Sequence, residues 1–360
     1  MGADRHRPGR VQAGGAPQVP GSPSVRGPVV TAVHGDAGLA TRIEELLGAR
    51  HPVAAAALIT TAGVTVASRG AGLDSDFEIG SVSKAVTGLL YADALDRGEL
   101  KPETTLGELL PLGDVPAARV TLASLSQHRS GLPRLPKTAQ PLRRTLALWR
   151  HGTNPYGEDL QQLLVQARTV RVGRPRARYS NFGFELLGHA IASAAGTSYA
   201  DLVQQRIASP LQLNRLYLPA TADQLGPDAL TGTSRRGRPR QPWTGEAVGP
   251  AGGIRATIGD MARLMAALLD GSAPGISALD PIAPFGKGAR IGAGWITITV
   301  KGHLITWHNG GTGGFRSWAG LDRDTATGAV VLSATSASVD RHGFLLLTER
   351  AETTRTASNS

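Results

Sequence analysis

A serine and a lysine spaced three residues apart form a possible nucleophile and base in this chain. The segment Gly80–Lys84 reads Gly-Ser-Val-Ser-Lys and runs into the apolar stretch Ala85–Leu100. At the first turn of a buried helix, Ser81 and Lys84 would share one face. A lysine whose pKa is lowered by burial can take the serine proton, and the helix N-terminus favours the developing negative charge. The spacing alone also fits an ordinary capped helix, so further residues must decide.

A tyrosine and an asparagine stand at the start of a later helix. The sequence Tyr-Ser-Asn at 179–181 follows a basic run and precedes the apolar stretch Phe182–Ala195. Near Lys84, the phenol of Tyr179 could move a proton between Ser81 and a leaving group. The alternative is a tyrosine that only packs at the helix start.

A glycine-rich segment supplies a third group of candidate residues. His308–Phe315 reads His-Asn-Gly-Gly-Thr-Gly-Gly-Phe and follows the strand-like Gly302–Trp307. The N–H of Gly311 could pair with that of Ser81 to bind an oxyanion. The alternative is a glycine-rich hairpin turn. A phosphate-binding loop is excluded because a strand-like segment, Arg316–Leu321, follows in place of a helix.

Together, S-x-x-K, Y-x-N and H-x-G in this order resemble the motifs of the penicillin-recognising serine enzymes. This group contains class C β-lactamases, D-alanyl-D-alanine carboxypeptidases and related esterases. The likeness runs from about Leu39 to the end of the chain, and other stretches look like segments of the same group: Phe77–Leu90, Leu125–Pro133 and Gly249–Leu264. The resemblance implies an α/β (α+β) fold, in which an antiparallel sheet built from both termini is flanked by helices and carries an inserted, mainly helical region.

The resemblance also implies a role for each site residue. Ser81 would attack an ester or amide carbonyl, Lys84 and Tyr179 would share the base and acid duties, and Asn181 would orient Lys84 and the substrate amide. The N–H groups of Ser81 and Gly311 would hold the oxyanion. The implied substrate-binding residues are Asn181, His308, Asn309, Gly310 and Gly311.

One departure from the family pattern concerns the substrate. Many β-lactam-processing relatives have Lys-Thr/Ser-Gly where this chain has His308-Asn309-Gly310. Histidine is largely neutral above its usual pKa of about 6.5, and asparagine offers an amide in place of a hydroxyl. We therefore expect poor penicillin hydrolysis but intact acyl transfer.

The expected function is a serine acyl-transfer enzyme. It would form an acyl-Ser81 intermediate from a small ester or amide and pass it to water, as an esterase or amidase, or to an amine, as a transacylase in secondary-metabolite biosynthesis. The alternatives are a β-lactamase or D-alanyl-D-alanine carboxypeptidase, which would require export, and an inactive binding or scaffold relative.

Composition narrows the chemistry further. Apolar residues make up 41% of the 360 residues, enough for a substantial core, and the chain has no cysteine. Disulfides and thiolate metal sites are therefore excluded. The nine histidines show no pairing at metal-ligand spacing. We expect neither a metal nor a cofactor.

The net charge of +10 has a local source. Between Arg134 and Arg178 there are ten Lys or Arg residues against Glu158 and Asp159, and Arg235–Arg240 is a second cluster. These charges are either a solvated surface or a rim that attracts an anionic substrate. Nucleic acid is not expected, because no aromatic interleaving or recognised module accompanies the charge.

The composition of the N-terminal segment predicts that this segment is disordered and that the protein is cytoplasmic. Residues 1–28 are rich in Gly, Pro and Arg and carry no apolar run. A secretory signal would need such a run, and nothing later approaches the length of a membrane span.

Hydrophobic periodicity predicts the helices and strands on which the motifs lie. We expect sheet-forming regions at 29–80 and 285–360 and a mainly helical region at 81–284, in one catalytic unit. The predicted helices are Gly38–Arg50, Ser81–Arg97, Thr121–Gln127, Leu160–Ala167, Phe182–Ala195, Tyr199–Ala208, Ile258–Asp270 and Val339–Ala351. The predicted strands are Val53–Thr61, Gly63–Arg69, Gly294–Lys301, His303–His308, Ser317–Asp322 and Ala329–Ala334.

Overall fold

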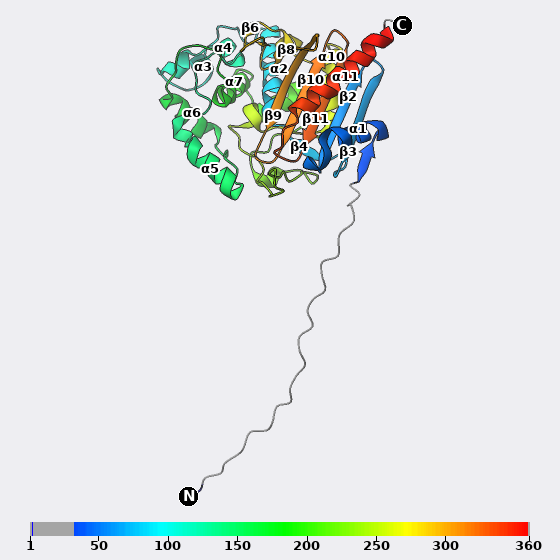
Figure 1. Cartoon of the computed structure of the whole chain (residues 1–360). Coiled ribbons are helices and arrows are strands. Elements are labelled where there is room, and N and C mark those ends of the chain that lie inside the picture. Colours follow the sequence, from blue (N-terminus) through cyan, green and yellow to red (C-terminus); the bar gives the residue numbers. More distant parts are fainter. Residues whose placement is uncertain (1, 3–31, 359–360) are drawn as a thin grey trace. The chain divides into compact units, whose positions relative to one another are not determined.

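The computed structural model describes residue 2 and residues 32–358, and residues 32–358 cluster in one compact unit (Figure 1). The segment 1–28, predicted to be disordered, lies outside the described residues apart from Gly2. None of the described helices is long and apolar enough to cross a membrane.

Strands from both ends of the described chain form one antiparallel sheet, which confirms the predicted fold. In the described residues this sheet has nine strands in the order β1-β3-β2-β11-β10-β9-β8-β7-β6. N-terminal β2 pairs with C-terminal β11, with Ala57 opposite Val330. The strands are β1 (Val33–Gly35), β2 (Ala54–Thr60), β3 (Gly63–Arg69), β6 (Ala283–Pro284), β7 (Arg290–Ile291), β8 (Ile296–Val300), β9 (His303–Gly311), β10 (Arg316–Asp322) and β11 (Thr327–Ser333).

Both faces of the sheet are covered by packed side chains. Alternate residues of a strand point to opposite faces, so one strand contributes to two cores. Ala54 and Ala56 of β2 belong to a core with α1 (Ala37–Leu47) and α11 (Asp340–Ser358), in which Trp318 is fully buried. Ala55 and Ala57 face the larger core instead. Figure 1 shows α11 running across the sheet strands.

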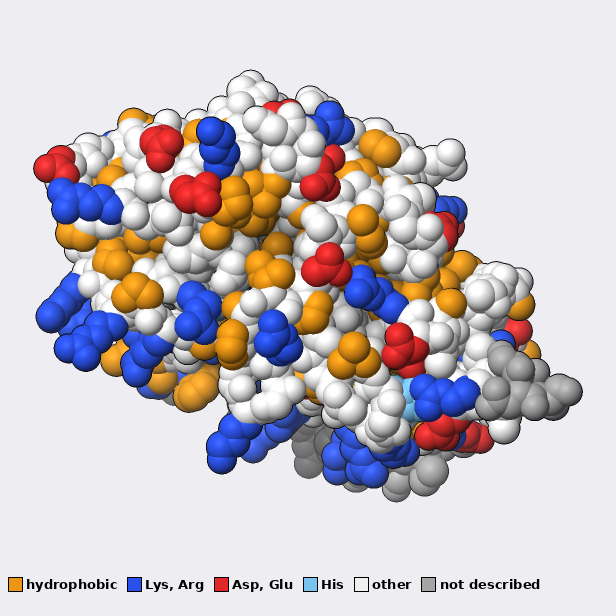
Figure 2. All heavy atoms as spheres, turned by 90° about the horizontal axis from the view of Figure 1, so that it is seen from above, with side chains coloured by type: hydrophobic (Ala, Val, Ile, Leu, Met, Phe, Trp, Pro, Cys, Tyr) orange, Lys and Arg blue, Asp and Glu red, His pale blue; other side chains and the backbone are white. Residues whose placement is uncertain are grey.

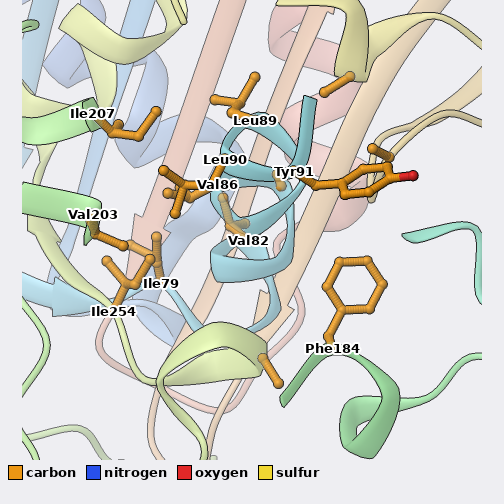
Figure 3. Packing of buried hydrophobic residues seen from close by; sticks show 14 of the residues in the cluster. Ile79, Val82, Val86, Leu89, Leu90, Tyr91, Phe184, Val203, Ile207 and Ile254 are labelled. Carbon is orange, nitrogen blue, oxygen red and sulfur yellow. The ribbon is translucent and has the colours of Figure 1, made fainter. Parts of the chain in front are cut away.

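The inserted region surrounds one central helix, α2 (Ser83–Asp96). Twelve of its residues are buried, so α2 is enclosed on all sides, as its mostly apolar sequence indicates. Figure 3 shows Val86, Leu89 and Leu90 among side chains from several other elements. The remaining helices of this region are α3 (Leu106–Leu109), α4 (Leu122–Ser126), α5 (Pro141–His151), α6 (Leu160–Thr169), α7 (Asn181–Ala194), α8 (Tyr199–Val203), α9 (Gly249–Gly252) and α10 (Ile258–Leu269).

Three features differ from the sequence-based prediction. A second, two-stranded sheet pairs β4 (Asp76–Glu78) with β5 (Arg255–Thr257), and neither strand was expected because each has only three residues. Helix α10 lies within 81–284 in sequence, yet it packs against β2 and β11 of the main sheet. Helix α5 falls in the basic stretch, where no helix was predicted.

The helix boundaries follow local capping. The Ser180 side chain accepts the backbone N–H of Gly183 and so begins α7 immediately after Tyr179. Thr257 and Asp260 form a reciprocal capping box at the start of α10. The cap at Ser180 therefore fixes where Tyr179 and Asn181 lie relative to the helix.

Candidate active site

Ser81 lies in a tight turn that rests directly on strand β9. The turn is η2 (Gly80–Val82), a single 3₁₀ turn before α2. Gly80 has a positive φ of 51°, and a Cβ there would lie 2.6 Å from the N atom of Gly311. A Cβ on Gly310 would lie 2.0 Å from the carbonyl O of Ile79. Glycine is thus required at both positions, and it brings Ser81 beside the end of β9.

Lys84 is completely buried one turn after Ser81. Its Nζ donates to Ser81 Oγ over 3.1 Å and also to the carbonyl O of Ala251 in α9. Burial lowers the pKa of Lys84 to about 7, and the opposing effect of the Glu185 carboxylate is smaller. Near neutral pH a large fraction of Lys84 is therefore unprotonated and able to accept the Ser81 proton.

Tyr179 completes a compact group with these two residues. Lys84 Nζ lies 4.9 Å from the centroid of the Tyr179 ring, and the His128 ring packs against the Tyr179 ring with 4.4 Å between their centroids. Burial raises the pKa of Tyr179 to about 12, whereas a hydrogen bond with Ser81 lowers it by less. The phenol therefore keeps its proton at neutral pH and can pass it on.

Asn181 does not orient Lys84 as predicted. Its Nδ2 donates to the hydroxyl of Tyr156 over 3.0 Å, whereas Lys84 is held by Ser81 and Ala251. The physical reason is the packing of α9 against α2, which places a backbone carbonyl at the lysine tip. Asn181 nevertheless lines the cavity beside Ser81, so a contact with substrate remains open to it.

His308 lies on β9, behind the reactive group. The side chain is buried, and its ring centroid is 6.3 Å from that of Tyr179. Its Nδ1 is 2.6 Å from the carbonyl O of Asn309, so Nδ1 carries the hydrogen and Nε2 is left as an acceptor. Burial and the nearby Lys84 lower the pKa of His308 to about 3, which keeps it neutral.

The Asn309 side chain, predicted to bind substrate, is engaged on the side of β9 that faces α11. Asn309 Nδ2 donates to Asp340 Oδ2 over 3.1 Å, at the start of α11. Side chains alternate across a strand, so the neighbour of inward-facing His308 points to the opposite side. The sequence motif could not show which of the two faces the site.

Gly311 presents a free edge of β9 toward Ser81. Strand β8 pairs with β9 only as far as Trp307, so beyond this residue that edge has no partner strand within the sheet. Thr312 N donates to Phe315 O on the other edge. Because successive N–H groups in an extended strand alternate in direction, the N–H of Gly311 points to the unpaired edge. It can act with the N–H of Ser81 as an oxyanion-binding pair.

A cavity of about 270 Å³ opens beside Ser81. Of the predicted site residues, Ser81, Asn181 and Gly311 line it, whereas Lys84, Tyr179 and His308 lie behind its wall. Arg134 and Arg144, from the basic stretch that was interpreted as a possible rim of the site, also line it. Sequence reasoning assigned no site role to four other lining residues: Tyr156, Glu158, Glu185 and Trp243. Of these, Glu185 had a sequence signal, because it follows Asn181 by four residues and so shares its helix face.

Most of the basic insertion faces solvent. Of the ten Lys and Arg residues between Arg134 and Arg178, only Arg134 and Arg144 line the cavity. Figure 2 shows Lys and Arg side chains in separate groups among hydrophobic and acidic ones on the face seen from above. Because only two arginines of this stretch line the cavity, the attraction of an anionic substrate remains a hypothesis.

No cluster of three or more His, Cys, Asp or Glu side chains suited to a metal ion occurs in the part of the chain that the structure describes. The groups gathered around Ser81 are instead an amine, a phenol, an amide and backbone N–H groups. This set is suited to proton transfer and to stabilising an oxyanion.

Comparisons with known proteins agree with the motifs and the fold. The sequence model of the β-lactamase family matches residues 39–349. The D-alanyl-D-alanine-carboxypeptidase/endopeptidase AmpH of Escherichia coli (strain K12) is 28% identical over 284 residues, which are 72% of this chain and 71% of that protein. Penicillin-binding protein 4 of Amycolatopsis lactamdurans is 29% identical over 302 residues, which are 78% of this chain and 70% of that protein.

Solved structures show the same fold at lower identity. A class C β-lactamase from Rhodobacter sphaeroides superposes with a TM-score of 0.69 at 21% identity, covering 84% of this chain and 95% of that chain. A β-lactamase/D-alanine carboxypeptidase from Pseudomonas syringae gives a TM-score of 0.71 at 17% identity, covering 82% and 93%. These two likenesses concern the fold alone.

Proposed function

Because this chain belongs to the β-lactamase family, as its motifs indicated, we propose that it forms an acyl-Ser81 intermediate from a small ester or amide. The observation that carries the proposal is the contact of 3.1 Å between Ser81 Oγ and Lys84 Nζ, a lysine whose pKa burial lowers to about 7. Burying a lysine is unfavourable because it disfavours the charged form. A lysine buried in contact with a serine therefore indicates a nucleophilic site.

The reaction follows from the positions of these groups. Unprotonated Lys84 takes the proton of Ser81 as the hydroxyl attacks the carbonyl carbon. The N–H groups of Ser81 and Gly311 stabilise the oxyanion, and Tyr179 passes a proton toward the leaving group. A second nucleophile, water or an amine, then discharges the acyl group by the reverse sequence.

Trapping the intermediate tests the proposal directly. During turnover of an activated p-nitrophenyl ester, acid-quenched protein should gain the mass of one acyl group. Peptide mapping should place that mass on the peptide containing Ser81, because only this cavity-lining hydroxyl contacts the lysine. Acylation at any other residue would contradict the assignment.

We propose that amines compete with water as acceptors of the acyl group on Ser81. Primary amines added to an ester reaction should raise total turnover and yield amide in preference to acid, because a positioned amine has a high effective concentration at the acyl carbon. Product ratios from mass spectrometry measure this. Acid as the dominant product at every amine concentration would make the enzyme a hydrolase.

A second candidate function is D-alanyl-D-alanine carboxypeptidase. The likeness to the Escherichia coli carboxypeptidase/endopeptidase and to penicillin-binding protein 4 favours it. Against it, neutral His308 supplies no fixed cation on β9 for a substrate carboxylate. Release of D-alanine from a D-alanyl-D-alanine peptide, compared with hydrolysis of a chromogenic cephalosporin and of simple esters, separates the two candidates.

A further inference from the structure

A buried glutamate that the mechanism does not use, Glu185, lines the cavity, and its Oε1 has no hydrogen-bond partner among the described residues. Glu185 follows Asn181 by one turn of α7, so both side chains line the same cavity wall. Glu185 is 4% exposed and Asn181 is 8% exposed. Within the described residues, neither Glu185 Oε1 nor Asn181 Oδ1 has a hydrogen-bond partner. Two buried acceptors facing one cavity call for a ligand that supplies hydrogen-bond donors.

The neighbouring cations are already committed elsewhere. Arg144 forms an ion pair with Glu158 and also donates to the carbonyl O of Pro155. The Arg134 guanidinium lies over the Tyr179 ring, 5.7 Å from its centroid. Lys84 donates to Ser81 and Ala251, as described above. In the part of the chain that is described, Glu185 therefore forms no ion pair.

The cavity walls also suit a cation. The rings of Tyr156 and Trp243 meet edge to face, 4.7 Å apart between centroids, and both line the cavity with Glu185. Aromatic rings beside a carboxyl attract an ammonium group, because ring faces carry negative charge density. Burial raises the pKa of the Glu185 carboxyl to about 8, and a bound ammonium would favour its ionised form.

We propose that Glu185 selects acyl donors that carry a primary amino group, with the ammonium held by the carboxyl of Glu185 and by Asn181 Oδ1. The proposal rests on the proposed acyl transfer to Ser81. Glu185 follows Asn181 by four residues, about 6 Å along the helix axis. Both residues line the cavity that Ser81 also lines, so one substrate can place its amino group at Glu185 and its carbonyl at Ser81. The substrate class is therefore an aminoacyl ester or amide with the amine on the acyl side.

Matched esters test this selection. The amino probes are the p-nitrophenyl esters of 3-aminopropanoate and 6-aminohexanoate, and butanoate and heptanoate esters carry a methyl group in place of the ammonium. We expect kcat/KM to favour at least one amino ester over its methyl partner by roughly tenfold or more, and Glu185→Gln to remove that preference. Glu103→Gln makes the same chemical change on the exposed surface and should leave the preference intact.

Other results of the same experiment would overturn the proposal. Equal or better turnover of both methyl esters would show that the cavity does not select a cation. An unchanged preference in Glu185→Gln would show that another group selects it. Faster turnover of the mono-p-nitrophenyl ester of adipate would assign the selection to the arginines.

Binding to a variant that cannot turn over substrate separates this proposal from the proposed function. Titration calorimetry with Ser81→Ala should show tighter binding of 6-aminohexanamide than of heptanamide. Adding Glu185→Gln to that background should abolish the difference. Equal binding of the two amides would overturn the selection by Glu185, whether or not any ester is turned over. Absence of ester turnover by the wild type would instead count against the acyl-transfer function.

Discussion

Replacing Ser81 with alanine is expected to abolish acylation and to lower kcat/KM for p-nitrophenyl esters by about 10⁴-fold or more. The substitution removes the only atom that can form the covalent bond, while the oxyanion donors and the cavity remain. The turn η2 should keep its backbone, because the Ser81 side chain interacts with the side chains of Lys84 and Tyr179 and does not cap the turn. Intact-mass analysis and steady-state kinetics measure the two effects.

Ser83 provides a matched control two residues along the chain. Its Oγ is fully buried and accepts the backbone N–H of Ile254, away from the cavity. Ser83→Ala leaves that N–H without its partner, which costs about 1–3 kcal/mol of stability. The expected result is a lower melting temperature with acylation retained. Loss of the acyl adduct in Ser83→Ala but not in Ser81→Ala would reverse the assignment.

Replacing Lys84 with methionine is expected to lower kcat/KM by about 10²–10⁴-fold, because it removes the base and keeps the side-chain volume. The melting temperature should stay unchanged or rise, since burial disfavours the charged lysine that the unfolded chain carries.

Tyr179→Phe should reduce kcat/KM on the same scale as Lys84→Met, because it removes the proton relay. Full activity in Tyr179→Phe would show that the phenol only packs.

The pH dependence of the wild type tests the same lysine. Its pKa lies at about 7, and the unprotonated amine is the active form. kcat/KM should therefore rise about tenfold per pH unit below this value and level off above it. Glu185, with a pKa of about 8, also faces the cavity, so the profile is repeated in Glu185→Gln. A titration step near pH 7 that persists in Glu185→Gln belongs to Lys84, because burial lowers the pKa values of His128 and His308 and keeps both neutral across the profile.

Local sequence patterns predicted most of the elements that carry the site. The apolar stretch after Lys84 predicts a buried helix, and α2 is such a helix. The predicted strands Val53–Thr61 and Gly63–Arg69, the second of which shows period-two alternation, match β2 and β3 to within one residue of the observed ends. These predictions succeed because helix and strand periodicity depend on residues close in sequence.

The contacts of the site depend on residues far apart in sequence. The carbonyl that holds Lys84 comes from Ala251, 167 residues later, and the partner of Asn309 comes from α11. Backbone carbonyls carry no sequence signature, so no motif could assign this role to Ala251. The face of β9 that His308 and Asn309 occupy follows from the packing of α11 on the sheet.

The sequence by itself predicted the candidate nucleophile segment and determined the order of the motifs, and it indicated a sheet built from both ends, because these depend on local spacing and hydrophobic pattern. Only the tertiary structure decided that Lys84 is desolvated, that the Gly311 N–H faces Ser81 and that Glu185 Oε1 has no hydrogen-bond partner among the described residues. Burial and the direction of a backbone N–H are properties of the packed chain, since both are set by elements that meet only after folding.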